Sequence, residues 1–243
     1  RTATGASLAE RVAALSWYHT IELPGGVVTN GQFDHRPLVR HYGLPANMHG
    51  LSALDVASFD GFWAFEMERR GARVTSIDLD RVASLDLPGP ARLQLEEEGI
   101  DRDHDAGRAF AMAREALGSN VERRVESIYD LTPERHGTFD FVHVADVLLH
   151  LENPTRALRA VRAVTAGQAL IVDAFRPGQD GAQWVEYRGG WQGLVWWMPS
   201  LSALGQMVLD AGFREVRLLN AYRLRKTAAG DPGLWRAVLQ ATP

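Results

Sequence analysis

The sequence predicts an α/β protein whose sheet is mostly parallel and ends in an antiparallel hairpin. Residues 54–78 read as a strand, a tight turn, a helix and a second strand that ends at Asp78. This is the order in which a nucleotide-binding sheet begins. Strand and helix patterns then alternate along the chain, as they do in parallel sheets. The last two strand patterns follow each other without a helix, which is typical of an antiparallel pair.

The first fifty residues are expected to form a helix and then a segment that covers the sheet. Apolar residues at helical spacing predict a short helix over residues 7–16. Residues 17–49 are rich in proline and glycine, which favours loops and turns with a short helix near residues 37–42. A long loop in a compact chain is often functional, for example as a lid. The predicted boundaries are residues 1–50 for the N-terminal helix and lid and residues 51–243 for the main domain.

The elements of the main domain follow from periodicity and from capping signals. The predicted strands are 53–57, 73–77, 121–125, 139–145, 168–175, 213–220 and 234–241. The predicted helices are 62–70, 106–117, 154–164 and 201–211. The connection 81–105 is strongly acidic toward its end and is expected to be a solvated loop. Residues 176–199 are expected to be a loop-rich insert.

Composition limits the classes of function that fit the chain. It has 243 residues, 46% of them hydrophobic and 23% charged, and a net charge of −4. These are the values of an ordinary soluble globular protein. No apolar run approaches the length that crosses a bilayer. The chain has no cysteine, which excludes disulfides and thiolate metal sites and fits a cytoplasmic protein. Residues 214–226 carry several basic side chains, but they fit a solvated strand face better than a nucleic-acid site.

The turn after the first strand disfavours a dinucleotide cofactor. Dinucleotide sites use the pattern G-x-G-x-x-G, because the backbone must approach a pyrophosphate closely. Here the corresponding positions are Ala57, Phe59 and Gly61, so only one glycine is present. Phe59 would obstruct a diphosphate, whereas a cofactor with one adenosine and no phosphate tolerates a bulkier turn. S-adenosylmethionine is such a cofactor, and Asp78, or Asp80 nearby, could hold its ribose hydroxyls.

Longer motifs carry a resemblance to a known family. They are WYHTIELPGG at 17–26, T-x-G-x-FD at 29–34, LDV-x-x-x-DGFWAFEMERRGA at 54–72, S-x-YDL at 127–131 and FD-x-V-x-x-x-D-x-LLHL at 139–151. In these motifs the chain resembles a branch of bacterial class I S-adenosylmethionine-dependent methyltransferases. That branch is distantly similar to the tRNA wobble-uridine carboxymethyltransferases, which use carboxy-S-adenosylmethionine. The resemblance covers about residues 16–175 and implies a Rossmann-like sheet of seven strands.

The resemblance also implies where the cofactor binds. The first turn would face the methionine part, Asp78 would hold the ribose, and residues after the third strand would flank the adenine. The implied cofactor-binding residues are Trp17, Phe33, Ala57, Ser58, Phe59, Gly61, Phe62, Asp78, Leu79, Ile128, Tyr129 and Ala145. The tRNA enzymes pair the extra carboxylate with a lysine and a tyrosine, where this chain has Gln32 and Leu149. We therefore expect plain S-adenosylmethionine.

Four residues are candidates for the catalytic base: His150, His143, His19 and Asp146. Methyl transfer is an in-line displacement in which the protein mainly aligns donor and acceptor. A base is needed only if the acceptor loses a proton. His150 could serve, or could be satisfied structurally at the strand–helix junction. His19 could close over the cofactor. Asp146 could contact the cofactor amino group or cap a helix. His143 alternates with apolar residues and is expected to be packed. The histidine spacings match no recognised ligand pattern, so no metal is expected.

The insert is the expected substrate region. Four of the seven tryptophans lie between residues 184 and 197. Such a concentration predicts an aromatic-lined pocket, with a hydrophobic core contact or a homodimer contact as the alternative. The candidate substrate residues are Trp184, Tyr187, Trp191, Trp196 and Trp197. The sequence thus favours methyl transfer to a small, aromatic or apolar metabolite. The alternatives are a tRNA-modifying enzyme and a non-catalytic protein that binds S-adenosylmethionine.

Overall fold

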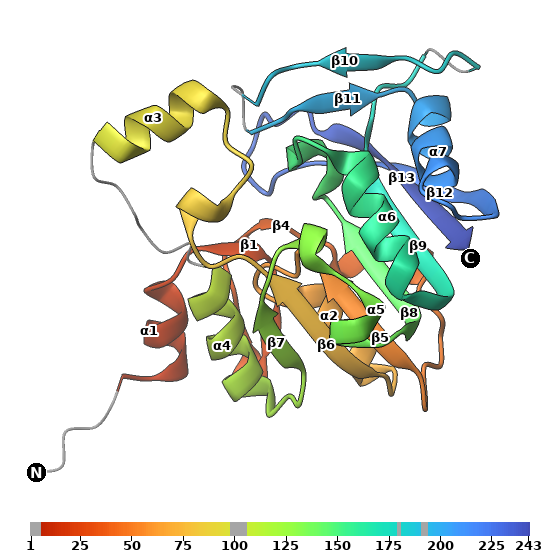
Figure 1. Cartoon of the computed structure of the whole chain (residues 1–243). Coiled ribbons are helices and arrows are strands. Elements are labelled where there is room, and N and C mark those ends of the chain that lie inside the picture. Colours follow the sequence, from red (N-terminus) through yellow and green to blue (C-terminus); the bar gives the residue numbers. More distant parts are fainter. Residues whose placement is uncertain (1–5, 98–105, 179–180, 191–193) are drawn as a thin grey trace, which may run out of the picture.

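A twisted sheet with helices on both faces forms the centre of the molecule (Figure 1). The structure is a computed structural model, and it describes residues 6–97, 106–178, 181–190 and 194–243. The seven strands lie in the order β12-β13-β9-β8-β5-β6-β7. Their bounds are β5 (Ser52–Val56), β6 (Arg73–Asp78), β7 (Glu122–Val125), β8 (Phe139–Ala145), β9 (Thr165–Phe175), β12 (Glu215–Leu224) and β13 (Leu234–Thr242).

The direction of the strands confirms the predicted fold class. β7, β6, β5, β8 and β9 pair in parallel, and β13 is antiparallel to both β9 and β12. Parallel strands bring their carboxyl ends to one edge of the sheet. The residues that follow β5, β6, β7 and β8 therefore converge on that edge, which is where ligands bind in open α/β sheets.

Two cores form because side chains alternate along each strand. Leu54 and Val56 pack with Leu158 of α6 on one face of the sheet. Ala53 and Phe141 pack on the other face with residues of α2 and α4. The helices are α1 (Leu8–Ala13), α2 (Phe62–Arg69), α3 (Gly89–Glu97), α4 (Ala106–Leu117), α5 (Pro133–His136), α6 (Pro154–Val164) and α7 (Leu201–Asp210). The 3₁₀ helices are η1 (Pro24–Gly26), η2 (Arg36–His41), η3 (Val82–Ser84), η4 (Ile128–Asp130) and η5 (Leu148–His150).

The N-terminal segment has more structure than the predicted loops and turns. β1 (Trp17–His19) pairs in parallel with β4 (Gly31–Phe33), and β2 (Glu22–Leu23) pairs with β3 (Val27–Val28). A buried carboxylate of the first turn, Asp60, accepts the N–H groups of Tyr18 and His19 in β1, each at 2.8 Å. The segment also buries Tyr42 and Met48 in the core that contains α2.

Two further regions differ from the prediction. The connection 81–105 contains a helix, α3, which starts at a Gly-Pro pair that suits a helix N-terminus. Most of its acidic run falls on residues 98–105, outside the described residues. The insert contains a hairpin of β10 (Val185–Tyr187) and β11 (Trp197–Pro199). Among the described residues no helix is both long and apolar enough to cross a bilayer.

Candidate active site

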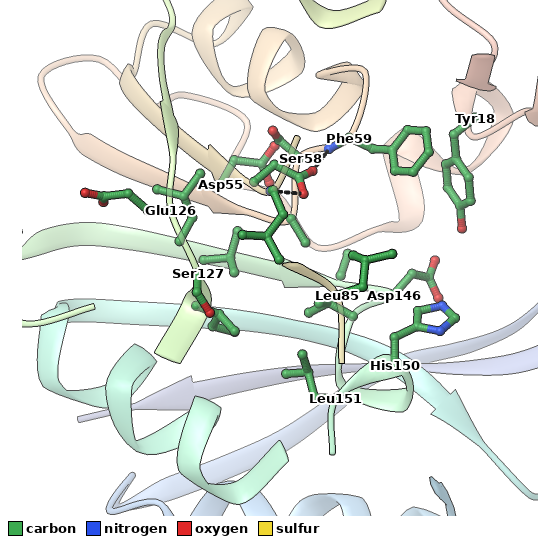
Figure 2. Close-up of a pocket in the computed structure, with 18 of the residues that line it drawn as sticks. Tyr18, Asp55, Ser58, Phe59, Leu85, Glu126, Ser127, Asp146, His150 and Leu151 are labelled. Carbon is green, nitrogen blue, oxygen red and sulfur yellow. Dashed lines mark hydrogen bonds between the residues drawn. The ribbon is translucent and has the colours of Figure 1, made fainter. Parts of the chain in front are cut away.

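The main cavity lies at the carboxyl ends of the parallel strands and has a volume of about 450 Å³. This volume is within the range of small-molecule sites, roughly 300–1,000 Å³. Figure 2 shows Glu126 and Ser127 at one end of the cavity and Tyr18, Asp146 and His150 at the other. The cavity is thus elongated along the edge of the sheet.

Asp78 forms the acidic wall of the cavity at the end of β6. One carboxylate oxygen accepts the N–H of Phe59 at 2.6 Å, and the other accepts the N–H of Leu79 at 2.7 Å. Burial raises the pKa of Asp78 to about 6. An ionised carboxylate can accept about four hydrogen bonds, so two remain for a ligand. This arrangement suits a pair of neighbouring hydroxyls, as in a ribose.

The turn between β5 and α2 holds two non-glycine residues in the left-handed region. Ala57 has a φ of 57° and Phe59 a φ of 51°. The left-handed region costs a non-glycine residue roughly 1–2 kcal/mol. The backbone is held there in part by hydrogen bonds from Ala57 and Ser58 to the carbonyl of Ile77, at 2.9 and 3.4 Å. Ala57, Ser58 and Phe59 all line the cavity, and strain of this kind is typical of ligand sites.

His150 stands at the opposite end of the cavity, in η5. Its Nδ1 lies 3.0 Å from the carbonyl oxygen of Leu194. A carbonyl only accepts, so Nδ1 carries the proton and Nε2 of the neutral ring keeps a lone pair. Burial lowers the pKa of His150, and this change favours the neutral ring. His150 also lines the cavity.

Asp146 forms an ion pair rather than a cap. Its carboxylate pairs with Nε of Arg236, a residue of β13 that is only 5% exposed. The capping alternative for Asp146 is wrong, because Asp173 accepts the N–H groups of Val147 and Leu148, at 3.1 and 2.7 Å. The charge of Asp146 is therefore balanced at the edge of the cavity.

His19 and Tyr18 reach the cavity from the N-terminal segment. Nδ1 of His19 pairs with the carboxylate of Asp60, which is completely buried. The Tyr18 ring packs between Phe33 and Phe59, with centroids at 4.8 and 5.0 Å. In Figure 2 its hydroxyl points toward the end of the cavity that holds Asp146 and His150. Burial raises the pKa of Tyr18 well above its usual value, so the hydroxyl stays a donor.

A chain of buried polar groups lies beside this end of the cavity. Nδ1 of His143 is 2.6 Å from a carboxylate oxygen of Asp55, and Nε2 is 3.1 Å from the Tyr42 hydroxyl. His143 is 1% exposed, in agreement with its predicted packing. Both His143 and Asp55 also contribute to the cavity wall.

The predicted cofactor residues fall into two groups. Those that line the cavity are Ala57, Ser58, Phe59, Asp78, Leu79, Ile128, Tyr129 and Ala145. The others, Trp17, Phe33, Gly61 and Phe62, are not among the residues that line it. Trp17 donates its indole N–H to the carbonyl of Val12 at 2.9 Å, and Phe62 stacks on His19 with centroids 5.5 Å apart. They support the wall rather than form it.

Sequence reasoning missed several residues of the cavity wall. They include Tyr18, Leu85, Asp86, Glu126, Ser127 and Leu194. Glu126 and Ser127 directly follow β7, so the rule that ligands bind at carboxyl ends of strands was a usable signal for them. Leu85 and Leu194 lie in irregular connections, and no sequence pattern identifies them.

The insert aromatics line a second cavity of about 560 Å³. Tyr187, Trp196 and Trp197 contribute to it, and it shares Asp86 and Tyr129 with the main cavity. Trp184 lines neither of these two cavities, and Trp191 lies outside the described residues. The predicted substrate residues are thus placed beside the main cavity, and none of those described lines it.

The strand order and the elongated cavity beyond the strand ends define a class I methyltransferase. The chain matches the family described as a methyltransferase domain over residues 36–218, and it belongs to that family. The prediction of an S-adenosylmethionine-dependent methyltransferase is thereby confirmed at the level of the family. The narrower resemblance to the tRNA wobble-uridine branch stays a prediction.

Comparison with known proteins supports the same fold. The N-terminal domain of EvdMO1 with S-adenosylhomocysteine bound is 18% identical, with a TM-score of 0.68, and the match covers 97% of this chain and 95% of that one. An S-adenosylmethionine-dependent methyltransferase from Mesorhizobium loti is 16% identical, with a TM-score of 0.54, over 85% of this chain and 97% of that one.

Curated relatives match the chain only in part. The ubiquinone biosynthesis O-methyltransferase of Xanthomonas euvesicatoria is 33% identical over 111 residues, which are 46% of this chain and 37% of that protein. The enzyme of the same name from Xanthomonas oryzae is 32% identical over 130 residues, or 53% and 45% of the two chains. The chain therefore spans less than half the length of these relatives.

Proposed function

We propose that the protein transfers a methyl group from S-adenosylmethionine to an acidic hydroxyl, such as a phenol, of a small molecule. The adenosine would lie between Asp78 and Tyr129, with the ribose hydroxyls on the Asp78 carboxylate. The methyl group would then face the end of the cavity formed by Tyr18 and His150. These residues line one continuous cavity, and this continuity supports the orientation.

The tautomer of His150 is the observation that supports an acidic hydroxyl as the methyl acceptor. Its Nδ1 proton is committed to the Leu194 carbonyl, so Nε2 is the atom that can take a proton. A neutral imidazole matches a phenol, whose proton is lost near pH 10, far better than it matches an aliphatic alcohol. S-adenosylmethionine would supply the methyl group and would leave as S-adenosylhomocysteine when its carbon–sulfur bond breaks. Nε2 of His150 would take the proton that the acceptor oxygen loses as it bonds to the methyl carbon.

The relatives support this acceptor class. Two of the curated proteins that match part of the chain are named as O-methyltransferases. We propose plain S-adenosylmethionine rather than its carboxylated form. The extra carboxylate would need a lysine and a tyrosine as partners, but at these two positions the chain has Gln32, which lines the cavity, and Leu149, which is buried away from it. A small-molecule partner is part of the proposal. A cytoplasmic location, a homodimer and a lid role for residues 1–50 stay predictions.

The test is methyl transfer with and without the base. Purified protein is incubated with S-adenosylmethionine and a panel of phenols, aliphatic alcohols and amines, and S-adenosylhomocysteine is measured by mass spectrometry. We expect turnover with phenols and a loss of about 10²–10⁴ in kcat for His150→Gln. Binding of S-adenosylhomocysteine should change less than about threefold, because His150 lies at the acceptor end. Turnover restricted to amines, or an unchanged kcat in the variant, would contradict the proposal.

A further inference from the structure

We propose that the second cavity binds a neutral, hydroxylated ring, such as a sugar, that is attached to the methyl acceptor. This inference rests on the proposed function, because it concerns the part of the acceptor that lies beyond the reacting hydroxyl. The acceptor would then be an aryl glycoside or a compound of similar shape, with the phenol in the main cavity and the second ring next to it.

The walls of the two cavities are continuous along the chain. His150 lines the main cavity, and Glu152, two residues later, lines the second. In the same way Leu194 lines the main cavity and Trp196 the second. Extended residues span at most about 3.6 Å each, so the Cα atoms of His150 and Glu152 lie no more than about 7 Å apart. An acceptor two rings long covers that distance.

Aromatic rings form one wall of the second cavity. Tyr187 is 63% exposed, and its ring centroid lies 4.9 Å from that of Trp197. The indole N–H of Trp196 donates to the carbonyl of Asp86 at 2.8 Å, and that of Trp197 donates to the carbonyl of Glu152 at 3.0 Å. These bonds fix both indoles and use their only donors, so the rings offer apolar faces. Such faces suit the C–H face of a sugar ring.

Charged groups of opposite sign form the rest of the wall. Glu152 and Arg156 both belong to the residues that line the second cavity. The guanidinium lies 4.9 Å from the centre of the Tyr129 ring. A carboxylate accepts hydrogen bonds from hydroxyls and a guanidinium donates them. Two carboxylates, Asp86 and Glu152, face one guanidinium in this lining, so the wall disfavours an anion, and all three groups can bond to the hydroxyls of a polyol.

Calorimetry tests the assignment without requiring turnover. Protein saturated with S-adenosylhomocysteine is titrated with hydroquinone and with its monoglucoside, which keeps one free phenolic hydroxyl. We expect the glucoside to bind at least about tenfold more tightly than hydroquinone, from a few new hydrogen bonds and one ring contact. In Glu152→Gln and Trp197→Ala this advantage should fall below threefold, with hydroquinone binding unchanged. Glu215→Gln, an exposed change on β12, is the matched control and should keep the advantage.

The outcomes separate the two proposals. Equal binding of the two compounds, absence of binding by both, or an equal loss for both in Glu152→Gln would overturn the assignment of the second cavity. Glu152→Gln is a surface change, so it remains informative if Trp197→Ala folds poorly. If the glucoside binds more tightly but neither compound is methylated, the cavity assignment stands and the proposed reaction fails.

Discussion

The pH dependence of cofactor binding provides a quantitative prediction from Asp78. Its pKa in the free protein is raised to about 6 by burial. We expect the ribose hydroxyls to bind the ionised carboxylate, so affinity should rise as pH increases through 6 and level off above about 7. At pH 5 about one carboxyl in eleven is ionised, whereas at pH 7.5 nearly all are, which predicts about tenfold weaker binding at pH 5. The corresponding free energy is about 1.4 kcal/mol.

The measurement is the dissociation constant of S-adenosylhomocysteine by calorimetry, from pH 5 to pH 8 at constant ionic strength. The ligand's own carboxyl titrates below this range, and the comparison of pH 5 with pH 7.5 is made where its amino group is mostly protonated. Asp78→Asn is the control, because the amide keeps the shape of the side chain and does not ionise. It should weaken binding about 10- to 100-fold at pH 7.5, the value of one charge-assisted hydrogen bond or more.

The change in the dissociation constant of Asp78→Asn with pH tests the role of Asp78. In Asp78→Asn the dissociation constant should change less than about twofold between pH 5 and pH 7.5. If wild type and variant show the same slope, another group controls the pH dependence and the ribose assignment of Asp78 is wrong. A wild-type affinity that falls as pH rises would refute it as well.

Two further predictions concern stability. Gly61→Ala should lower the free energy of unfolding by about 2 kcal/mol or more. The reason is that φ at Gly61 is 92° and that a Cβ there would lie 2.6 Å from the Phe65 ring and 2.7 Å from the Phe110 ring. A denaturant midpoint equal to that of the wild type would contradict this prediction. Arg236→Met should cost about 3–5 kcal/mol because it leaves the Asp146 charge buried and unpaired. Adding Asp146→Ala should recover at least half of that loss in urea unfolding, and a further loss would show that charge imbalance is not the cause.

Strong local patterns explain what the sequence could predict. The central strands were identified because buried parallel strands are continuous apolar runs, and Leu54 and Val142 lie in such runs. Asp78 was identified because it ends one of these strands. His150 follows another strand closely enough for the chain itself to bring it to the same edge. In each case one short stretch of sequence determines where the side chain lies.

The remaining features depend on partners that are remote in sequence. Strands of two or three residues, such as Trp17–His19, have no detectable periodicity, and this one is positioned by Asp60. Arg236 looks like an ordinary surface arginine in a strand, yet it pairs with Asp146, 90 residues away. The aromatic residues of the insert were expected to line the substrate pocket. Backbone hydrogen bonds between β10 and β11 determine where these side chains lie, and composition does not reveal those bonds.

The contact of Asp60 with the N-terminal segment has a consequence for how the chain can be divided. One carboxylate holds two backbone N–H groups and the His19 ring, and it belongs to the turn that lines the main cavity. A truncation that removed residues 1–50 would leave Asp60 buried without these partners and would uncover the Trp63 ring, which now stacks on Tyr42 at 3.7 Å. We therefore expect the N-terminal segment and the turn after β5 to unfold together.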